Sequence, residues 1–307
     1  MEELMTNWPA WKGGGEVATA SVGTPDSAPT WEIPTILFRA GIPEQNEVEG
    51  AQLSGFRVVF QRTDLQEGDL VIPRYSALPF YQELEQDVKN LGAKLLNTYS
   101  QHRYVADLKN WYQDFQNIGY NGSPITPHTW FSLHEIPENG PFVVKGETNS
   151  KKNMWSTCMF AENKKDAIDV ASRLVTDSYL GDQEIYVRSF VPLAQFGLAI
   201  GGLPITEEYR FFVLNGKVMA SGFYWSEHVD WLRDKHNFIP DPMRVPDGFI
   251  GTVLATVGQR IPFYVFDVGR LSNNDWVLIE LNDGQMSGLC EIDPSVLYQN
   301  VGKELVR

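Results

Sequence analysis

The sequence predicts an α+β protein in which a small α/β lobe precedes a region built mainly of β-sheet. Short hydrophobic runs and one amphipathic helical pattern alternate in residues 31–104, whereas strand pairs joined by tight turns dominate the second half. Hydrophobic residues make up 43% and charged residues 21% of the 307 residues. This balance is typical of a globular protein with a sizeable core.

An N-terminal arm, residues 1–30, is expected to be flexible. Its glycine triplet, residues 13–15, is followed by small and polar residues and by two prolines. A glycine triplet can also suggest a phosphate-binding loop. However, no strand precedes this one and no helical pattern follows it, so a linker is the better interpretation.

The α/β lobe, residues 31–104, is predicted from three strands and a helix. Short buried strands are expected at residues 36–38, 57–60 and 69–72. Apolar residues then recur at three- and four-residue spacing, which predicts an amphipathic helix: Phe80, Leu84, Val88, Leu91 and Leu95.

Residues 105–307 are expected to form a larger domain. A strand at residues 142–145 runs into a polar loop, and Asn163 is the expected N-cap of the next helix, whose apolar stripe is Ile168, Ala171, Leu174 and Val175. Another strand is expected at residues 185–191. Asn215-Gly216 between two hydrophobic runs predicts a β-hairpin, and residues 263–268 and 276–281 predict a further strand pair.

Charge and composition limit the partners. The formal net charge is -14 and the isoelectric point is about 4.8, which argues against a nucleic-acid substrate bound along a basic groove. No long apolar run and no signal-peptide pattern is present, so no membrane association is expected and the location is expected to be cytoplasmic. The two cysteines suggest neither a disulfide framework nor a zinc site.

Three oxygen-bearing side chains predict a metal site. Asp267 lies inside an apolar run, where a carboxylate is costly to bury unless it is paired or binds a cation. Glu280 and Asn282 are two residues apart and therefore point to one face of a strand. If the two strands are neighbours, the three side chains converge as ligands for Mg²⁺. The alternative is a solvent-facing acid beside an ordinary turn.

Lys145 stands at the end of a hydrophobic strand, directly before a polar loop that contains Ser150, Lys151 and Lys152. A mobile loop rich in hydroxyl, amide and ammonium groups suits a cover for a triphosphate. The alternative for Lys145 is a solvated charge at a strand end.

The order of these features resembles that of the ATP-grasp superfamily. It runs from Lys145 and its loop, through the strand at 185–191 and the segment Glu208-Tyr-Arg210, to Asp267 and Glu280-Leu-Asn282. Residues 69–76 and 99–109 resemble a clade of formerly uncharacterised phage and bacterial members, and the resemblance covers roughly residues 55–290. It implies two α+β subdomains that clasp ATP, preceded by a pre-ATP-grasp lobe. Residues 145–191 would carry the phosphate loop and hinge, and residues 205–290 the metal-binding sheet.

The resemblance also implies roles for individual residues. Lys109 and Lys145 would face the nucleotide, with Ser150 and Lys152 in the covering loop. The hinge would run from Glu184 to Arg188, where backbone groups of Tyr186 and Val187 would read the adenine edge. Arg210 would approach the γ-phosphate, and Asp267, Glu280 and Asn282 would hold Mg²⁺. Arg188 stands where an acid is more usual after the hinge.

The implied activity is an ATP-dependent ligation of a carboxylate to an amine through an acyl-phosphate. Arg210 and Lys145 are the expected catalytic cations. Arg74 and Arg188 are candidates for holding the substrate carboxylate, although each could instead form a salt bridge. By analogy the substrates are small molecules, amino acids or peptides, and a homodimer is left open. The alternatives are a kinase that stops at phosphoryl transfer, a nucleotide-binding regulator without turnover, and a purely structural protein.

Overall fold

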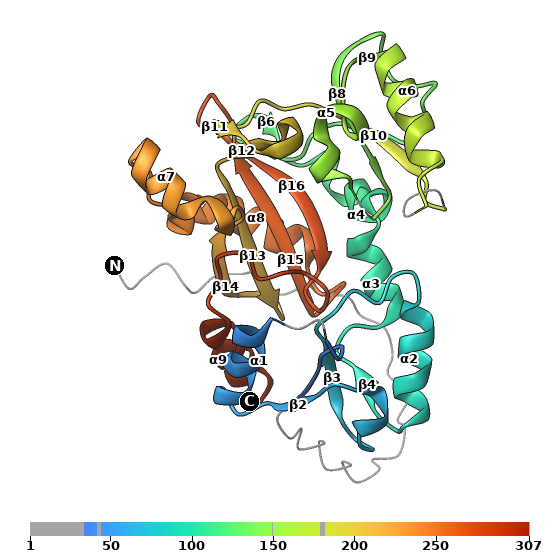
Figure 1. Ribbon diagram of the computed structural model, residues 1–307, viewed down its shortest axis with the longest axis vertical. Coiled ribbons are helices and arrows are strands. Elements are labelled where there is room, and N and C mark those ends of the chain that lie inside the picture. Colours follow the sequence, from blue (N-terminus) through green and yellow to red (C-terminus); the bar gives the residue numbers. More distant parts are fainter. Residues whose placement is uncertain (1–33, 42–43, 149, 179–181, 307) are drawn as a thin grey trace, which may run out of the picture. The chain divides into compact units, whose positions relative to one another are not determined.

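The computed structural model describes residues 34–41, 44–148, 150–178 and 182–306, and residues 31–307 belong to one unit. The predicted flexible arm, residues 1–30, lies outside the described residues. The described chain contains three four-stranded sheets (Figure 1). The shorter helices and strands outside these sheets are α3 (Tyr99–Ala106), α4 (Leu108–Phe115), α5 (Trp155–Cys158), β5 (Gly119–Tyr120), β6 (Ser123–Pro124), β11 (Gln195–Leu198) and β12 (Pro204–Thr206).

The first sheet is parallel, in the order β2-β1-β3-β4, and forms the predicted α/β lobe. Its elements are β1 (Thr35–Leu37), α1 (Gln45–Leu53), β2 (Arg57–Val59), β3 (Leu70–Pro73), α2 (Tyr81–Asn90) and β4 (Lys94–Leu95). The predicted helix is present, but Leu95 lies in β4. The reason is Gly92, whose φ of 75° turns the chain out of the helix.

The second sheet is antiparallel, in the order β7-β10-β8-β9, and α6 packs against it. Its elements are β7 (Thr129–Trp130), β8 (Asn139–Gly146), β9 (Phe160–Asn163), α6 (Lys164–Val175) and β10 (Ile185–Ser189). The predicted cap is present, because the side-chain oxygen of Asn163 accepts a hydrogen bond of 3.1 Å from the Asp166 amide. The stripe differs from the prediction: Ile168 and Val175 are exposed, and α6 buries Ala167, Val170, Ala171 and Leu174.

The third sheet is antiparallel, in the order β14-β13-β15-β16. Its strands are β13 (Glu208–Leu214), β14 (Lys217–Phe223), β15 (Phe263–Arg270) and β16 (Trp276–Asp283). Both predicted strand pairs are present. At the hairpin turn Asn215 and Gly216 adopt φ values of 50° and 75°, which is the conformation that an Asn-Gly hairpin turn requires.

The two faces of the third sheet have different partners. One face is apolar and belongs to the core that includes α8 (Asp247–Val257) and residues of α4 and α7 (Val229–His236). On the other face, Phe212 and Val265 share a core with α1 and with α9 (Pro294–Leu305). The remaining part of that face carries charged side chains, which start with Glu208 and Arg210. The fold therefore leaves one end of one sheet face free for polar chemistry.

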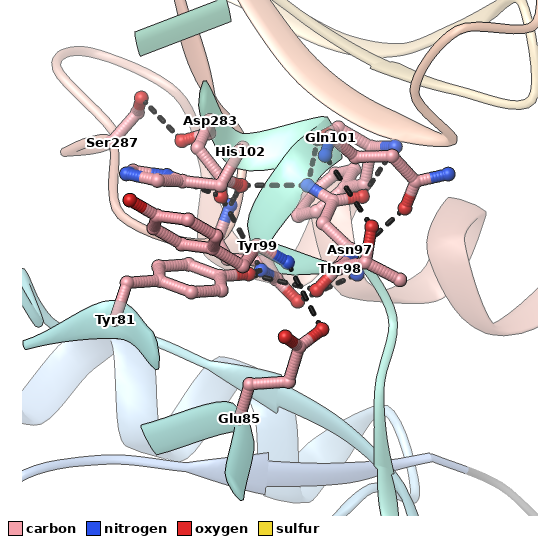
Figure 2. Close-up of polar contacts among 12 residues, drawn as sticks. Tyr81, Glu85, Asn97, Thr98, Tyr99, Gln101, His102, Asp283 and Ser287 are labelled. Atoms are coloured by element: carbon pink, nitrogen blue, oxygen red, sulfur yellow. Dashed lines mark hydrogen bonds and ion pairs between the residues drawn. The ribbon is translucent and has the colours of Figure 1, made fainter. Parts of the chain in front are cut away.

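A buried polar network joins the lobe to the end of β16 (Figure 2). The Asp283 carboxylate accepts hydrogen bonds from the Asn97 amide at 2.7 Å and from Nδ1 of His102 at 3.0 Å. The ring of His102 stacks on Tyr81 at 4.2 Å. Because Asp283 directly follows Asn282, the network anchors the strand that carries the predicted metal ligands.

No helix in the described part of the chain is long and apolar enough to span a membrane.

Candidate active site

A cavity of about 290 Å³ lies between the second sheet and the charged part of the third. Its wall includes apolar and aromatic side chains such as Phe190, Leu203 and Trp225. The charged side chains in its wall are Lys145, Lys152, Arg188, Glu208 and Glu280. A pocket with one apolar region and convergent charges suits a ligand that has a flat ring and an anionic tail.

Three of the predicted side chains form a row across neighbouring strands. Arg210 on β13 lies directly opposite Asp267 on β15, and Asp267 lies directly opposite Glu280 on β16. Directly opposed residues of antiparallel strands project on the same face, with their Cβ atoms about 5 Å apart. Arg210 therefore makes a bidentate ion pair with Asp267, with both N–O distances at 2.8 Å.

The Glu280 carboxylate accepts a short hydrogen bond from the Lys145 ammonium, which reaches it from β8. Burial alone would raise the pKa of Glu280, but Lys145 and Lys152 outweigh burial and lower this pKa to about 2. Burial and the nearby Arg188 and Lys152 lower the pKa of Lys145 despite its contact with Glu280. The cavity thus holds an ionised carboxylate within a cluster of cations.

The chemistry of the donor set fits Mg²⁺. Asp267 and Glu280 each supply a carboxylate, and Asn282 hydrogen-bonds to Glu280 and supplies an amide oxygen. Within the described residues no cluster combines three or more His, Cys, Asp or Glu side chains, so the set is two acids and an amide. Such a partial set is usual for Mg²⁺, which takes its remaining ligands from water and substrate phosphates.

The segment after Lys145 is largely ordered. Ser150 lines the cavity, and Lys152 begins the short 3-10 turn η2 (Lys152–Met154). The Lys152 ammonium donates a hydrogen bond of 2.6 Å to the Tyr224 hydroxyl and lies 4.3 Å from the centre of that ring. Burial lowers the pKa of Lys152, but Tyr224, Glu280 and Glu208 raise it on balance. Lys152 is therefore a charged group at the cavity wall.

The expected hinge residues lie beside the cavity wall and do not line it. Tyr186 pairs with Lys145, and Val187 pairs with Val144 on one side and Trp130 on the other. Their backbone groups thus face neighbouring strands. The segment at the end of β10 and directly after it, residues 189–193, lines the cavity instead.

Lys109 and Glu184 form an ion pair of 3.5 Å, with about half of each side chain exposed, and neither lines the cavity. The Tyr186 hydroxyl also donates to Glu184, at 2.9 Å. The Tyr186 hydrogen bond and then Lys109 lower the pKa of Glu184. The structure thus gathers three of the predicted nucleotide-binding residues at one place outside the cavity wall.

The two arginines predicted to hold a carboxylate have different surroundings. Arg74 is buried in the lobe, and its three nitrogens donate to the Glu47 carboxylate and to the carbonyls of Gly284 and Ser287. It ties the lobe to the loop after β16 and does not line the cavity. Arg188 does line the cavity, and its donors reach β16 and residues 126–129.

Glu208 was missed in the sequence, although it lines the cavity. The Thr206 hydroxyl and Nε1 of Trp225 both donate to its carboxylate. Burial raises the pKa of Glu208, although Lys152 opposes this effect. Glu208 is two residues before Arg210, so the alternation of a strand places both on one face. That alternation was the available signal.

Comparison with known proteins identifies the family. A family model described as an ATP-grasp domain, family 3 of its clade, matches residues 132–301, more than half of the chain. No curated protein matches the sequence.

Several solved structures share the fold. The D-cycloserine synthetase DcsG is 13% identical, with 88% of this chain and 99% of that protein covered at a TM-score of 0.56. An ATP-grasp RimK domain protein from Sphaerobacter thermophilus is 14% identical, with coverages of 87% and 98% and a TM-score of 0.53. The ATP-grasp ligase PsnB, complexed with the precursor peptide PsnA2 and AMPPNP, is 10% identical, with coverages of 90% and 98% and a TM-score of 0.53.

These structures confirm the predicted α+β class and the ATP-grasp fold. The matched residues 132–301 contain Lys145, Arg210, Asp267, Glu280 and Asn282, and so include the cavity's charged wall. The chain belongs to the ATP-grasp proteins, in the clade family whose model it matches.

Proposed function

We propose that this protein is an ATP- and Mg²⁺-dependent ligase that joins a carboxylate to an amine through an acyl-phosphate, releasing ADP. The observation that carries this proposal is the row Arg210–Asp267–Glu280, with Lys145 reaching Glu280 from the opposite sheet. The row combines metal-binding oxygens and phosphate-binding cations on one side of one cavity. A structural protein has no need for such a set.

ATP would lie with its base in the apolar part of the cavity and its phosphates near the charged end. Residues 189–193 and Trp225 line the apolar part, and Glu208 offers a carboxylate to the ribose hydroxyls. Lys145 and Lys152 supply positive charge for the phosphates. Asp267, Glu280 and Asn282 would hold the Mg²⁺, which neutralises charge on the transferring phosphoryl group when bound.

In the first step an oxygen of the substrate carboxylate attacks the γ-phosphorus, and ADP leaves. Arg210 neutralises charge on the transferred group, and Ser150 and Lys152 help to cover the reacting atoms and exclude water. In the second step the amine nitrogen attacks the acyl carbon, phosphate leaves, and the amine gives up a proton. The protein supplies position and charge, and no covalent intermediate with a side chain is needed.

Peptides or amino acids are the proposed substrates. Two of the structurally similar proteins, PsnB and a ligase associated with ribosomally made peptides in Chryseobacterium gregarium, were solved with peptides bound. DcsG, by its name, makes the amino-acid analogue D-cycloserine. These similarities support a substrate class and do not select one compound.

Calorimetry with AMPPNP, in Mg²⁺ and in excess EDTA, tests the site. We expect Mg²⁺-dependent binding that the double variant Glu280→Ala, Asn282→Ala loses and that the exposed control Glu138→Ala retains. No binding by the wild type at millimolar nucleotide would overturn the proposal.

Turnover is tested by ADP release with pools of amino acids and dipeptides, and with hydroxylamine as a trap for acyl-phosphate. We expect a trapped hydroxamate and an amide product that depends on the amine. A stable phosphorylated product that forms without any amine would identify a kinase instead.

A further inference from the structure

The strand that carries two of the proposed metal ligands contains a register shift. Leu278 lies opposite Val268, but Glu280 lies opposite Asp267, so β16 holds one extra residue, Ile279, at this point. Such a one-residue insertion is a β-bulge. Bulges reverse the alternation of side chains along the rest of a strand.

This reversal decides where the ligands point. Leu278 faces the apolar core beneath the sheet. In a strand with regular alternation, Glu280 would project into that same core, because residues two apart share a face. With the extra residue, Leu281 returns to the core while Glu280 faces the cavity beside Asp267. Thus the bulge places the carboxylate where a cation can reach it.

Contacts from outside the sheet hold both residues of the bulge. The Arg188 guanidinium donates to the Ile279 carbonyl at 2.5 Å, and the Thr126 hydroxyl donates to the Leu278 carbonyl at 3.0 Å. Arg188 also donates to the Thr126 hydroxyl at 2.9 Å, and the Leu278 amide donates to the Ile125 carbonyl at 2.7 Å. Successive carbonyls of a regular strand point in opposite directions. Here two successive carbonyls are held by one connected group.

Arg188 is otherwise an unusual residue for this position. It is buried, and no carboxylate of the described residues lies within ion-pair distance of it. Burial lowers its pKa to about 10, although Glu280 and Tyr112 oppose this effect. Its hydrogen bonds go to neutral oxygens, which offset the cost of burial.

We propose that Arg188 and Thr126 are positioning residues, which hold the bulge at Ile279 and thereby turn Glu280 and Asn282 toward the Mg²⁺. The metal part of this inference rests on the proposed function, whereas the bulge part does not. It gives Arg188 a role different from substrate binding. The two roles are separable, because a substrate-binding arginine would change the affinity for substrate and leave the metal unaffected.

Two buried threonines offer a matched pair of variants. Both hydroxyls accept from Arg188, Thr126 at 2.9 Å and Thr129 at 3.3 Å. Thr126 donates to the bulge, whereas Thr129 donates to the Pro127 carbonyl. Replacing each by the isosteric valine therefore removes similar chemistry, and one replacement touches the bulge directly. Arg188→Lys keeps the charge but cannot supply two separated donors, and Thr126→Ser restores the hydroxyl.

Hydrogen exchange of the metal-free protein tests the bulge part. In Thr126→Val and Arg188→Lys we expect the amides of residues 276–283 to exchange roughly tenfold faster than in the wild type. Thr129→Val and Thr126→Ser should remain within about twofold. Equal acceleration in Thr126→Val and Thr129→Val would overturn the assignment.

The affinity for Mn²⁺ in the presence of ADP, followed by electron paramagnetic resonance, tests the metal part. We expect Thr126→Val and Arg188→Lys to bind Mn²⁺ roughly tenfold more weakly, with ADP binding in EDTA unchanged. Unchanged Mn²⁺ affinity in both variants would overturn the metal part. A wild type that binds no Mn²⁺ would overturn the proposed function itself, and the exchange experiment would still decide the bulge part.

Discussion

Two buried ion pairs dominate the site at the scale of single residues. Lys145 pairs with Glu280, and Arg210 pairs with Asp267. Removing a buried charge from water is costly, and each pair offsets that cost only while both partners remain. Loss of one partner leaves an uncompensated charge in the cavity. The same charges are the ones expected to meet phosphate and Mg²⁺.

Replacement of Glu280 by glutamine should destabilise the protein by about 3 kcal/mol at pH 7, because Lys145 loses its counter-charge. The pKa of Glu280 is held at about 2 in the folded protein, below the ordinary value of 4.5. The unfolded chain therefore takes up a proton that the folded chain does not as the pH falls from about 4.5 toward 2. The stability difference between wild type and Glu280→Gln should shrink in that window.

Urea unfolding at pH 7, 5, 4 and 3.5 measures this difference. Glu138→Gln, on the exposed surface, serves as the control and should show little difference at any pH. A stability gap for Glu280→Gln that stays constant down to the lowest pH would contradict the assigned ion pair.

At the scale of elements, the tip of the β11–β12 hairpin contacts the segment that carries Lys152. Gly201 in the 3-10 turn η3 (Ile200–Gly202) has a φ of 77°, and a Cβ there would lie 2.6 Å from the Asn153 carbonyl oxygen. A side chain at this position would therefore push the tip away from η2. The hairpin and the Lys152 segment depend on each other for their positions.

Gly201→Ala should weaken the binding of AMPPNP with Mg²⁺ by roughly tenfold, because Lys152 loses its support. Gly216→Ala is a matched control, since its φ is 75° but nothing lies within 4 Å of the added Cβ. This control should cost about 1 kcal/mol of stability from backbone strain alone and leave binding unchanged. Calorimetry and urea unfolding provide the two measurements, and equal binding losses in both variants would contradict the contact.

At the scale of the whole molecule, the network of Asp283 connects the lobe with the third sheet (Figure 2). Its donors come from Asn97, after β4, and from His102 in α3, both buried. Arg74 makes a second connection, to carbonyls of the loop after β16. We expect these connections to make the lobe and the third sheet unfold together.

Asp283→Leu should cost about 3 kcal/mol or more, because two buried donors lose their acceptor. Asp293→Ala, which removes only the N-cap of α9, should cost about 1 kcal/mol. Urea unfolding followed by tryptophan fluorescence compares the two variants. A cost for Asp283→Leu no greater than that for Asp293→Ala would show that the network contributes little.

Local patterns were sufficient for much of the fold and part of the site. The Asn-Gly turn, the Asn163 cap and the alternation along strands act over a few residues, so the sequence by itself determined the hairpin, the start of α6 and the shared face of Glu280 and Asn282. It also determined the α+β class and the family, because the ordered motifs are visible without a structure.

Tertiary structure alone decided which groups meet. Lys145 and Glu280 are far apart in the chain, as are Arg188 and Ile279, and no local period reports such contacts. The structure likewise distinguished the buried tie Arg74 from the cavity residue Arg188. It also moved the cavity wall to residues 189–193, because the backbone of an interior strand is occupied by its neighbours. The bulge at Ile279 belongs to this second group, since its register depends on the partner strand and on side chains that hold it from outside the sheet.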